Sequence, residues 1–147
     1  MPTNTYGPGD NYNLKTSHFL PALIKKIHQA KKQKNKTLNL WGHGKTKREL
    51  IYVDDLADAC VFFMNKKTNH SLINIGTGVD HSIKEYANLI MKILKINLKI
   101  IFDKSKPDGT PKKILNISVA KKYGWSAKIS FKDGIIKTYS DFLVKEK

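Results

Sequence analysis

The sequence predicts an α/β fold, with an α+β arrangement left open for its distal part, and three observations carry that prediction. Short runs with the pattern of strands alternate along the chain with runs that have the apolar spacing of helices. The 147 residues are enough for one domain with a hydrophobic core. Hydrophobic residues make up 40% of the chain, a composition typical of folded proteins. We therefore expect one folded unit without long linkers or repeats.

Four runs have the pattern of strands, because they are short, rich in apolar residues and followed by turn residues. They cover residues 37–41, 49–53, 71–75 and 98–102. Gly42-His43-Gly44 forms a turn after the first run, and Gly76-Thr77-Gly78 follows the third. The last run leads into a polar loop, residues 103–113, which contains two prolines and a glycine. That loop is expected to be mobile.

Five runs have the apolar spacing of helices, and each begins at a residue that can cap a helix. They begin near residues 16, 54, 82, 118 and 130. The expected caps of the first two are Thr16 or Ser17, and Asp54 or Asp55. Ser82 with Glu85 three positions later has the pattern of a capping box. The residues expected to face inward on the last helix are Ile135, Ile136, Tyr139 and Phe142. A carboxylate pair for acid–base catalysis is the alternative interpretation of Asp54 and Asp55.

The net charge of +15 attracts polyanions such as nucleic acid or phosphorylated ligands. Of the 27 basic residues only Arg48 is an arginine, and the lysines are scattered through every segment. Arginine is favoured for base readout and for paired hydrogen bonds to phosphate. No helix-turn-helix, RNA-recognition or zinc-finger pattern is present. We interpret most lysines as solvated surface, and a basic nucleic-acid-binding module stays as an alternative.

The remaining composition favours a soluble cytoplasmic protein. Cys60 is the only cysteine, so no intrachain disulfide can form, as suits a reducing compartment. Its apolar neighbours predict a small buried side chain rather than a reactive thiol. The N-terminus does not resemble a signal peptide, and no apolar run approaches the roughly 18 residues of a membrane span. No spacing of Cys, His and carboxylates indicates a metal site.

Several motifs are weak alone but specific in their order. In sequence they are Pro2-Thr3-Asn4-x-Tyr6-Gly7-Pro8, Ser17-His18, Trp41-Gly42-x-Gly44-x-x-x-Arg48-Glu49, Tyr52-Val53-Asp54-Asp55, Ile73-Asn74-Ile75-Gly76-Thr77-Gly78 and Ser105-Lys106-Pro107-Asp108-Gly109-Thr110-Pro111-Lys112-Lys113. This series resembles the extended short-chain dehydrogenase/reductase superfamily of NAD-dependent epimerases and dehydratases. The Ser17-His18 pair and the 105–113 loop resemble its GDP-L-fucose synthase branch, and the likeness covers essentially the whole chain.

The resemblance implies a fold and a place within it. Residues 1–147 would be the substrate-binding, C-terminal portion of a Rossmann-type NAD(P)-binding fold, with a small α/β substrate-binding domain. The family's N-terminal half carries the Gly-rich turn, the Tyr-x-x-x-Lys pair and the cysteine base, and this sequence is expected to lack it. Cys60 is not assigned the role of that base. A separate N-terminal half is therefore a possible partner, and the full-length enzyme would be a homodimer.

The activity implied by the resemblance has two steps. GDP-4-keto-6-deoxy-D-mannose is epimerised at C3 and C5, and NADPH then reduces C4 to give GDP-L-fucose. His18 would be the acid that protonates the carbanion, as suits a histidine, which can carry a transferable proton near neutral pH, and it would also contact NADP. The other NADP contacts would be Pro2, Thr3, Asn4 and Thr5.

The resemblance also implies a set of substrate contacts: Lys26, Trp41, Arg48 and Asp108. An indole offers a flat apolar face to a base or sugar, and a guanidinium binds phosphate through paired hydrogen bonds. Lys26 stands where the family usually has arginine, so it keeps the charge and loses the paired geometry. Another nucleotide-sugar epimerase or dehydratase of the superfamily is the nearest alternative, which the Ser17-His18 pair and the 105–113 loop disfavour.

We expect no reductase activity from this chain alone, because acid, base and cofactor must be positioned together for hydride transfer. The purified chain should therefore leave NADPH unoxidised in the presence of the 4-keto sugar nucleotide. Steady turnover of the ketosugar by the chain would contradict this expectation.

Overall fold

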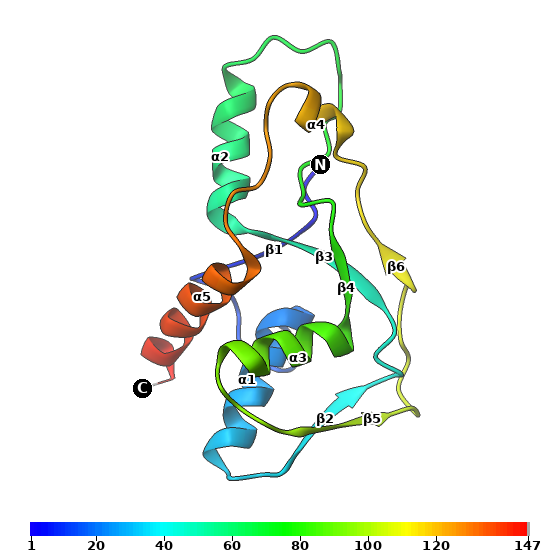
Figure 1. Ribbon diagram of the computed structural model, residues 1–147, viewed down its shortest axis with the longest axis vertical. Coiled ribbons are helices and arrows are strands. Elements are labelled where there is room, and N and C mark those ends of the chain that lie inside the picture. The colour runs from blue at the N-terminus through cyan, green and yellow to red at the C-terminus, as the bar shows by residue number, and fades with distance from the viewer. Residues whose placement is uncertain (147) are drawn as a thin grey trace.

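The computed structural model describes residues 1–146, and these form an α/β fold (Figure 1). The strands are β1 (Asn4–Tyr6), β2 (Thr37–Trp41), β3 (Lys47–Tyr52), β4 (Asp80–Ser82), β5 (Lys99–Asp103) and β6 (Lys112–Lys113). The helices are α1 (Phe19–Lys32), α2 (Val53–Met64), α3 (Ile83–Ile93), α4 (Ser118–Lys122) and α5 (Phe131–Lys145). The predicted α/β class is confirmed. None of these helices is long and apolar enough to cross a lipid bilayer.

Strand β3 is the centre of the larger sheet. It pairs in parallel with β1, where Asn4 lies opposite Leu50, and antiparallel with β4, where Arg48 lies opposite His81. The short β6 pairs in parallel with the beginning of β3. Strands β2 and β5 form a separate parallel pair at the bottom of Figure 1, with their register running from Thr37–Lys99 to Trp41–Asp103.

The apolar side chains gather in two clusters. The larger lies among α1, α3 and α5, where the fully buried side chains include Leu20, Ile24, Tyr86, Ile90, Ile135 and Phe142. The smaller joins α2 and α4 through Ala59, Ala120 and Trp125, in the upper part of Figure 1. Strand β3 connects the two, since Leu50 belongs to the first cluster and Ile51 to the second. This follows from the alternation of side chains along a strand.

A buried carboxylate holds β3 to three other segments. Glu49 is 0% exposed, and its Oε1 and Oε2 accept hydrogen bonds from the backbone N–H of Gly78 (2.7 Å) and of Leu115 (2.8 Å). Its backbone carbonyl accepts from Thr3 Oγ1 (3.2 Å) and Asn4 Nδ2 (3.1 Å). The carboxylate also passes so close to the 76–78 turn that a Cβ at Gly76 would collide with it. Glu49 therefore fixes the positions of β1, of this turn and of the chain after β6.

The expected caps of the first two helices are wrong. His18 is the N-cap residue of α1, and Tyr52 is that of α2; neither provides a side-chain cap. Strand β3 runs directly into α2, so Tyr52 takes the cap position that Asp54 or Asp55 was expected to fill. The Asp55 carboxylate is buried and accepts instead from the backbone N–H of Lys128 and Ile129, both at 3.0 Å. It joins α2 to the segment before α5.

Of the expected caps of the later helices, Ser82 and Ser130 are confirmed, whereas Ile117 rather than Ser118 is the N-cap residue of α4. Ser82 Oγ accepts from the N–H of Glu85 (3.1 Å), and the Glu85 carboxylate accepts from the N–H of Ser82 (2.6 Å), which completes the capping box of α3. Ser130 Oγ accepts from the N–H of Asp133 (3.1 Å) at the start of α5. These caps form within one helical turn, so their sequence pattern is sufficient to predict them.

Three further expectations are wrong. Residues 71–75 do not form a strand, because only Ile75 has a β-bridge, an isolated one to Pro2, which lies before β1. Cys60 is exposed, since α2 turns its neighbour Ala59 toward the core instead. Ile136 is 46% exposed, because Ile135 takes the inward position on α5.

We predict that replacing Glu49 destabilises the fold. Glu49→Ala leaves two buried backbone N–H groups unpaired, at a cost of about 2–5 kcal/mol in the free energy of unfolding. Glu49→Gln keeps one acceptor and turns an N–H toward the other donor, so an intermediate loss is expected. Urea denaturation measures both, and Asp54→Asn, at an exposed carboxylate in the same region, is the matched control. Equal midpoints for Glu49→Ala and the unmodified chain would contradict the role given to Glu49.

Candidate functional site

A cavity of about 600 Å³ lies between the start of α1, the end of β2, the starts of β3 and α3, and the loop between β5 and β6. All four residues expected to contact a substrate line it: Lys26, Trp41, Arg48 and Asp108. They come from α1, β2, β3 and the loop, so the fold brings together side chains that lie far apart in the sequence. Apolar residues, among them Phe19 and Ile83, form the rest of the wall. An apolar cavity with a few polar groups is typical of a small-molecule site.

Arg48 is held at the cavity wall by its own backbone and by the loop. Its carbonyl accepts from Tyr86 Oη (2.9 Å). Its Nη1 donates to the carbonyls of Lys47 and Thr110, both at 2.7 Å. Within residues 1–146 the other guanidinium nitrogens make no hydrogen bond, and Arg48 is free of carboxylate partners there. The remaining donors are therefore available to an anionic ligand in the cavity.

Trp41 is a flat apolar surface between two ammonium groups. Its side chain is 65% exposed at the end of β2. Lys26 Nζ lies 5.4 Å from the ring centroid and Lys106 Nζ lies 5.9 Å from it, both within reach of a cation–π interaction. Partial burial lowers the pKa of Lys26. An aromatic face flanked by positive charges suits a ligand that combines a planar base with phosphates.

Asp108 lies at the cavity edge with its carboxylate already bound. Its Oδ1 accepts from the His43 N–H and its Oδ2 contacts His43 Nδ1, both at 2.6 Å. Thr46 Oγ1 donates to its backbone carbonyl at 3.0 Å. The hydrogen bonds from His43 lower the pKa of Asp108. Sequence reasoning gave His43 no role, and its only signal was its position between two turn glycines.

Ser17 lies in the same cavity wall, beside the expected catalytic residue. Its hydroxyl oxygen is buried and has no hydrogen-bond partner among residues 1–146. His18 is exposed at the N-terminus of α1, between Ser17 and Phe19 in the sequence, and unlike these two neighbours it does not line the cavity. Sequence reasoning used Ser17 only as a cap and as part of a motif, and the structure adds its hydroxyl to the site.

The four residues expected to contact NADP lie in and next to β1, outside this cavity. The side chains of Thr3 and Asn4 already donate to the Glu49 carbonyl, and Thr5 Oγ1 donates to the carbonyl of Thr3 (3.4 Å). Their contact with NADP stays a prediction. Within residues 1–146, no group of three metal-ligating side chains is close enough to hold a metal ion.

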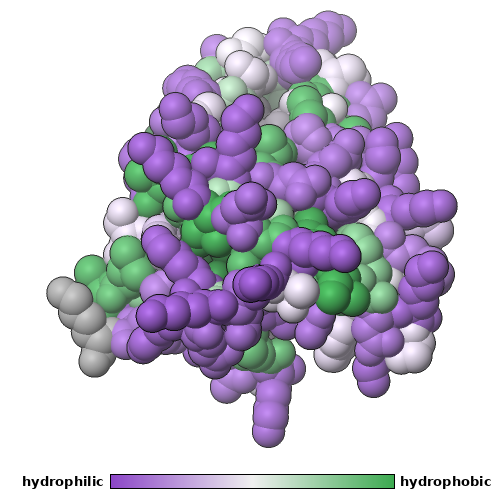
Figure 2. All heavy atoms as spheres, turned by 60° about the horizontal axis from the view of Figure 1, so that its bottom comes forward, coloured by the Kyte–Doolittle hydropathy of each residue, from purple (hydrophilic) through white to green (hydrophobic). Residues whose placement is uncertain are grey.

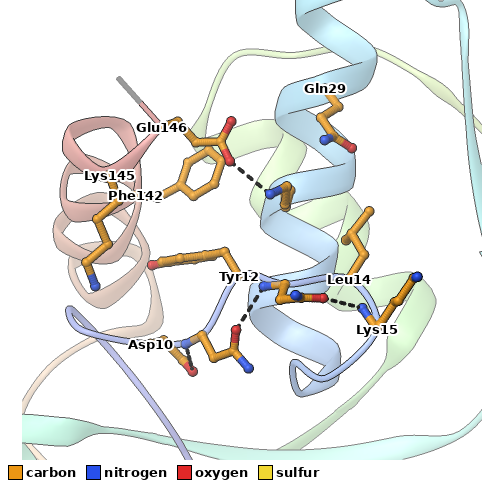
Figure 3. A pocket seen from close by; sticks show the side chains of 11 residues that line it. Asp10, Tyr12, Leu14, Lys15, Gln29, Phe142, Lys145 and Glu146 are labelled. Carbon is orange, nitrogen blue, oxygen red and sulfur yellow. Dashed lines mark hydrogen bonds and ion pairs between the residues drawn. The ribbon is translucent and has the colours of Figure 1, made fainter.

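A second hollow, of about 700 Å³, lies between α1, α5 and residues 10–15 (Figure 3). Lys25 pairs with Glu146 across it, with 2.9 Å between Nζ and Oε1. The Tyr12 ring lies against Phe142, with 4.7 Å between centroids, and its Oη donates to the Thr138 carbonyl. None of the residues expected to contact substrate or NADP lines this hollow. The ion pair across this hollow holds α1 against the end of α5.

The basic residues are dispersed over the surface. Figure 2 shows one face covered by hydrophilic side chains with apolar patches between them, rather than one continuous stripe. Several lysines pair with carboxylates, such as Lys112 with Asp80 (3.6 Å) and Lys128 with Asp58 (3.3 Å). This distribution agrees with the interpretation of most lysines as solvated surface.

Known proteins resemble this chain along nearly all of its length. The model of the NAD dependent epimerase/dehydratase family matches residues 1–76. A putative GDP-L-fucose synthase 2 of Arabidopsis thaliana is 44% identical over 143 residues, which are 97% of this chain and 44% of the relative. The GDP-L-fucose synthase of Escherichia coli is 41% identical over 152 residues, covering 97% of this chain and 47% of the relative. The chain thus spans about half the length of these relatives.

Solved structures agree with the sequence relatives. A GDP-L-fucose synthetase from Naegleria fowleri, solved with NADP bound, superimposes with a TM-score of 0.88 at 27% identity and covers 99% of this chain and 46% of its own. A GDP-mannoheptose C4 reductase from Campylobacter jejuni, also with NADP, gives a TM-score of 0.82 at 29% identity over 97% of this chain and 51% of its own. The fold is therefore that of part of these enzymes.

The resemblance inferred from the motifs is thus confirmed by a family model that matches more than half of the chain, by sequence relatives and by solved structures. This chain belongs to the NAD dependent epimerase/dehydratase family and is a homologue of GDP-L-fucose synthases.

Proposed function

We propose that this chain is the GDP-sugar-binding portion of a GDP-L-fucose synthase. The assembled enzyme would carry out NADPH-dependent 3,5-epimerisation and 4-reduction of GDP-4-keto-6-deoxy-D-mannose. The observation that carries the proposal is the convergence of Lys26, Trp41, Arg48 and Asp108 on one cavity. The relatives that bear the name GDP-L-fucose synthase support it, at 41–44% identity for those of Escherichia coli and Arabidopsis thaliana.

Each group in the cavity has a task in this proposal. Arg48 has free guanidinium donors and binds the diphosphate, with Lys26 adding a second positive charge. Trp41 offers its exposed face to the guanine or the sugar. Ser17 places its hydroxyl in the wall where a sugar hydroxyl or phosphate oxygen can meet it. The apolar remainder of the cavity excludes water around the bound sugar.

The chemistry would take place at the rim of the cavity near His18. As an imidazole with an exchangeable proton, His18 protonates the carbanion during epimerisation. NADPH supplies the hydride for reduction at C4 when it is bound. In this chain Pro2, Thr3, Asn4 and Thr5, together with His18, would contact its nicotinamide end. A cofactor-binding half, in a longer polypeptide or as a separate partner, would supply the phosphate-binding turn, and the assembled enzyme would be a homodimer.

A second candidate is another GDP-sugar enzyme of the same family. The likeness to a GDP-mannoheptose C4 reductase, at 29% identity, supports it. The same cavity would then bind GDP, and the sugar would differ. The two candidates share the role of Arg48 and Trp41, and they differ in which GDP-sugar binds most tightly.

We predict that the chain binds GDP-L-fucose or GDP-mannose and discriminates against UDP-sugars. Arg48→Ala and Trp41→Ala should each weaken binding about tenfold or more, because one loses the paired phosphate hydrogen bonds and the other the stacking surface. Arg48→Lys is the matched control, since lysine keeps the positive charge but lacks the paired donors of the guanidinium. A smaller loss of affinity is expected for it. Isothermal titration calorimetry measures all four proteins. Equal affinity for GDP- and UDP-sugars, or unchanged binding by Arg48→Ala, would contradict the proposal.

We predict that replacing Ser17 by alanine weakens GDP-sugar binding without lowering the stability of the fold. The hydroxyl has no hydrogen-bond partner within residues 1–146, so Ser17→Ala should leave the urea midpoint unchanged or raise it slightly. GDP-sugar affinity should fall about threefold to tenfold, as expected when one hydrogen bond to the ligand is lost. Ser140→Ala, at an exposed serine on α5, is the control for both measurements. A Ser17→Ala protein that binds as tightly as the unmodified chain would remove Ser17 from the site.

A further inference from the structure

The loop between β5 and β6 is held by strand pairing at its ends and by few contacts in between. At one end β5 pairs with β2 as far as Asp103, and at the other β6 pairs with the beginning of β3. Between these ends Thr46 Oγ1 donates to the carbonyl of Asp108, and Arg48 donates to the carbonyl of Thr110. The N–H of Lys47 donates to the carbonyl of Pro111 (2.8 Å), and the carboxylate of Asp108 binds His43 through both oxygens at 2.6 Å. We call this double contact the His43–Asp108 clasp.

The turn that carries His43 is shaped to receive Asp108. Gly42 has a φ of +73°, a conformation that favours glycine. A Cβ at Gly42 would collide with Oδ1 of Asp108. The turn is anchored to β5 as well, since the N–H of Gly42 donates to the carbonyl of Asp103 (2.9 Å). A glycine at this position therefore permits the carboxylate to approach the His43 N–H.

The clasp determines where the loop meets the cavity. Pro107 and Asp108 form part of the cavity wall, and Lys106 stands beside the Trp41 ring. Thr110 accepts a hydrogen bond from Arg48, so the loop also influences the direction of the guanidinium. If Asp108 were displaced, three features of the cavity would move with it. They are the wall formed by the loop, the ammonium group of Lys106 beside Trp41, and the Thr110 carbonyl that Arg48 binds.

Resting on the proposed GDP-sugar function, we propose that His43 is a positioning residue of this site. It holds the loop as a wall of the cavity by binding both carboxylate oxygens of Asp108. Asp108 then acts on the ligand through the loop that it anchors, because His43 holds both of its carboxylate oxygens toward the 42–44 turn. The expectation that Asp108 contacts the substrate directly is replaced, in this proposal, by an indirect role.

Two measurements distinguish the effect of the His43–Asp108 clasp on the loop from its effect on ligand binding. Trypsin cleaves after lysine, and cleavage after Lys104 reports an open loop in the ligand-free protein, with mass spectrometry to identify the site. Calorimetry with GDP-L-fucose reports the effect on binding. The variants are His43→Ala, His43→Asn, Asp108→Ala and the double variant His43→Ala/Asp108→Ala. His70→Ala, at an exposed histidine whose neighbour is Tyr123, is the control.

We expect His43→Ala to raise cleavage after Lys104 several-fold and to weaken GDP-L-fucose binding about threefold to tenfold, as suits a partly exposed charge-assisted pair. His43→Asn should restore both values toward those of the unmodified chain, because its side-chain amide places an N–H where Nδ1 stands. The double variant should weaken binding no more than Asp108→Ala alone does, since both residues act through one contact. His70→Ala should change neither readout.

Unchanged cleavage after Lys104 in His43→Ala would overturn the proposal, as would a His43→Asn protein that behaves like His43→Ala. A loss of binding in Asp108→Ala that far exceeds the loss in His43→Ala would also overturn it, because it would show direct contact of Asp108 with the ligand. If the unmodified chain binds no GDP-sugar, the proposed function fails, and the cleavage comparison still decides whether His43 holds the loop.

Discussion

The buried carboxylate of Glu49 is the interaction on which the candidate site depends. It binds the backbone N–H groups of Gly78 and Leu115, which fixes β3 between the 76–78 turn and the chain after β6. Neighbouring side chains on a strand point to opposite faces, so the burial of Glu49 directs Arg48 to the other face, where the cavity lies. A shift of one residue in the register of β3 would exchange the two side chains. The direction of the arginine is thus set by its neighbour.

Interactions between residues a few positions apart could be predicted from the sequence, and interactions between residues far apart in the sequence could not. The capping box of Ser82 and Glu85 and the strand over residues 37–41 follow from local patterns, and the structure has both. The carboxylates of Glu49 and Asp55 bind N–H groups between 29 and 74 residues away. No local pattern distinguishes such a buried acceptor from a surface acid or a helix cap. For this reason Asp55 was assigned to the wrong role, and Glu49 to none.

The same difference between local patterns and long-range contacts applies to the candidate site. Resemblance to a family selected Lys26, Trp41, Arg48 and Asp108, and the fold places all of them at one cavity. Their residue types alone would not have distinguished them, apart from Arg48 as the single arginine of a lysine-rich chain. The contact between His43 and Asp108 joins residues 65 positions apart and depends on the shape of a glycine turn. The NADP-contacting role of residues 2–5 and the catalytic role of His18 stay predictions.

We propose that the cavity beside Trp41 binds a GDP-sugar. The chain's two tryptophans allow this binding to be measured directly. Trp41 is 65% exposed at the cavity, whereas Trp125 is 3% exposed in the smaller core cluster and donates its Nε1–H to Asp58. In an NMR titration with GDP-L-fucose, the account predicts that the indole N–H resonance of Trp41 shifts with saturation and that of Trp125 stays in place. A titration in which the Trp41 resonance does not move, or in which both move alike, would contradict it.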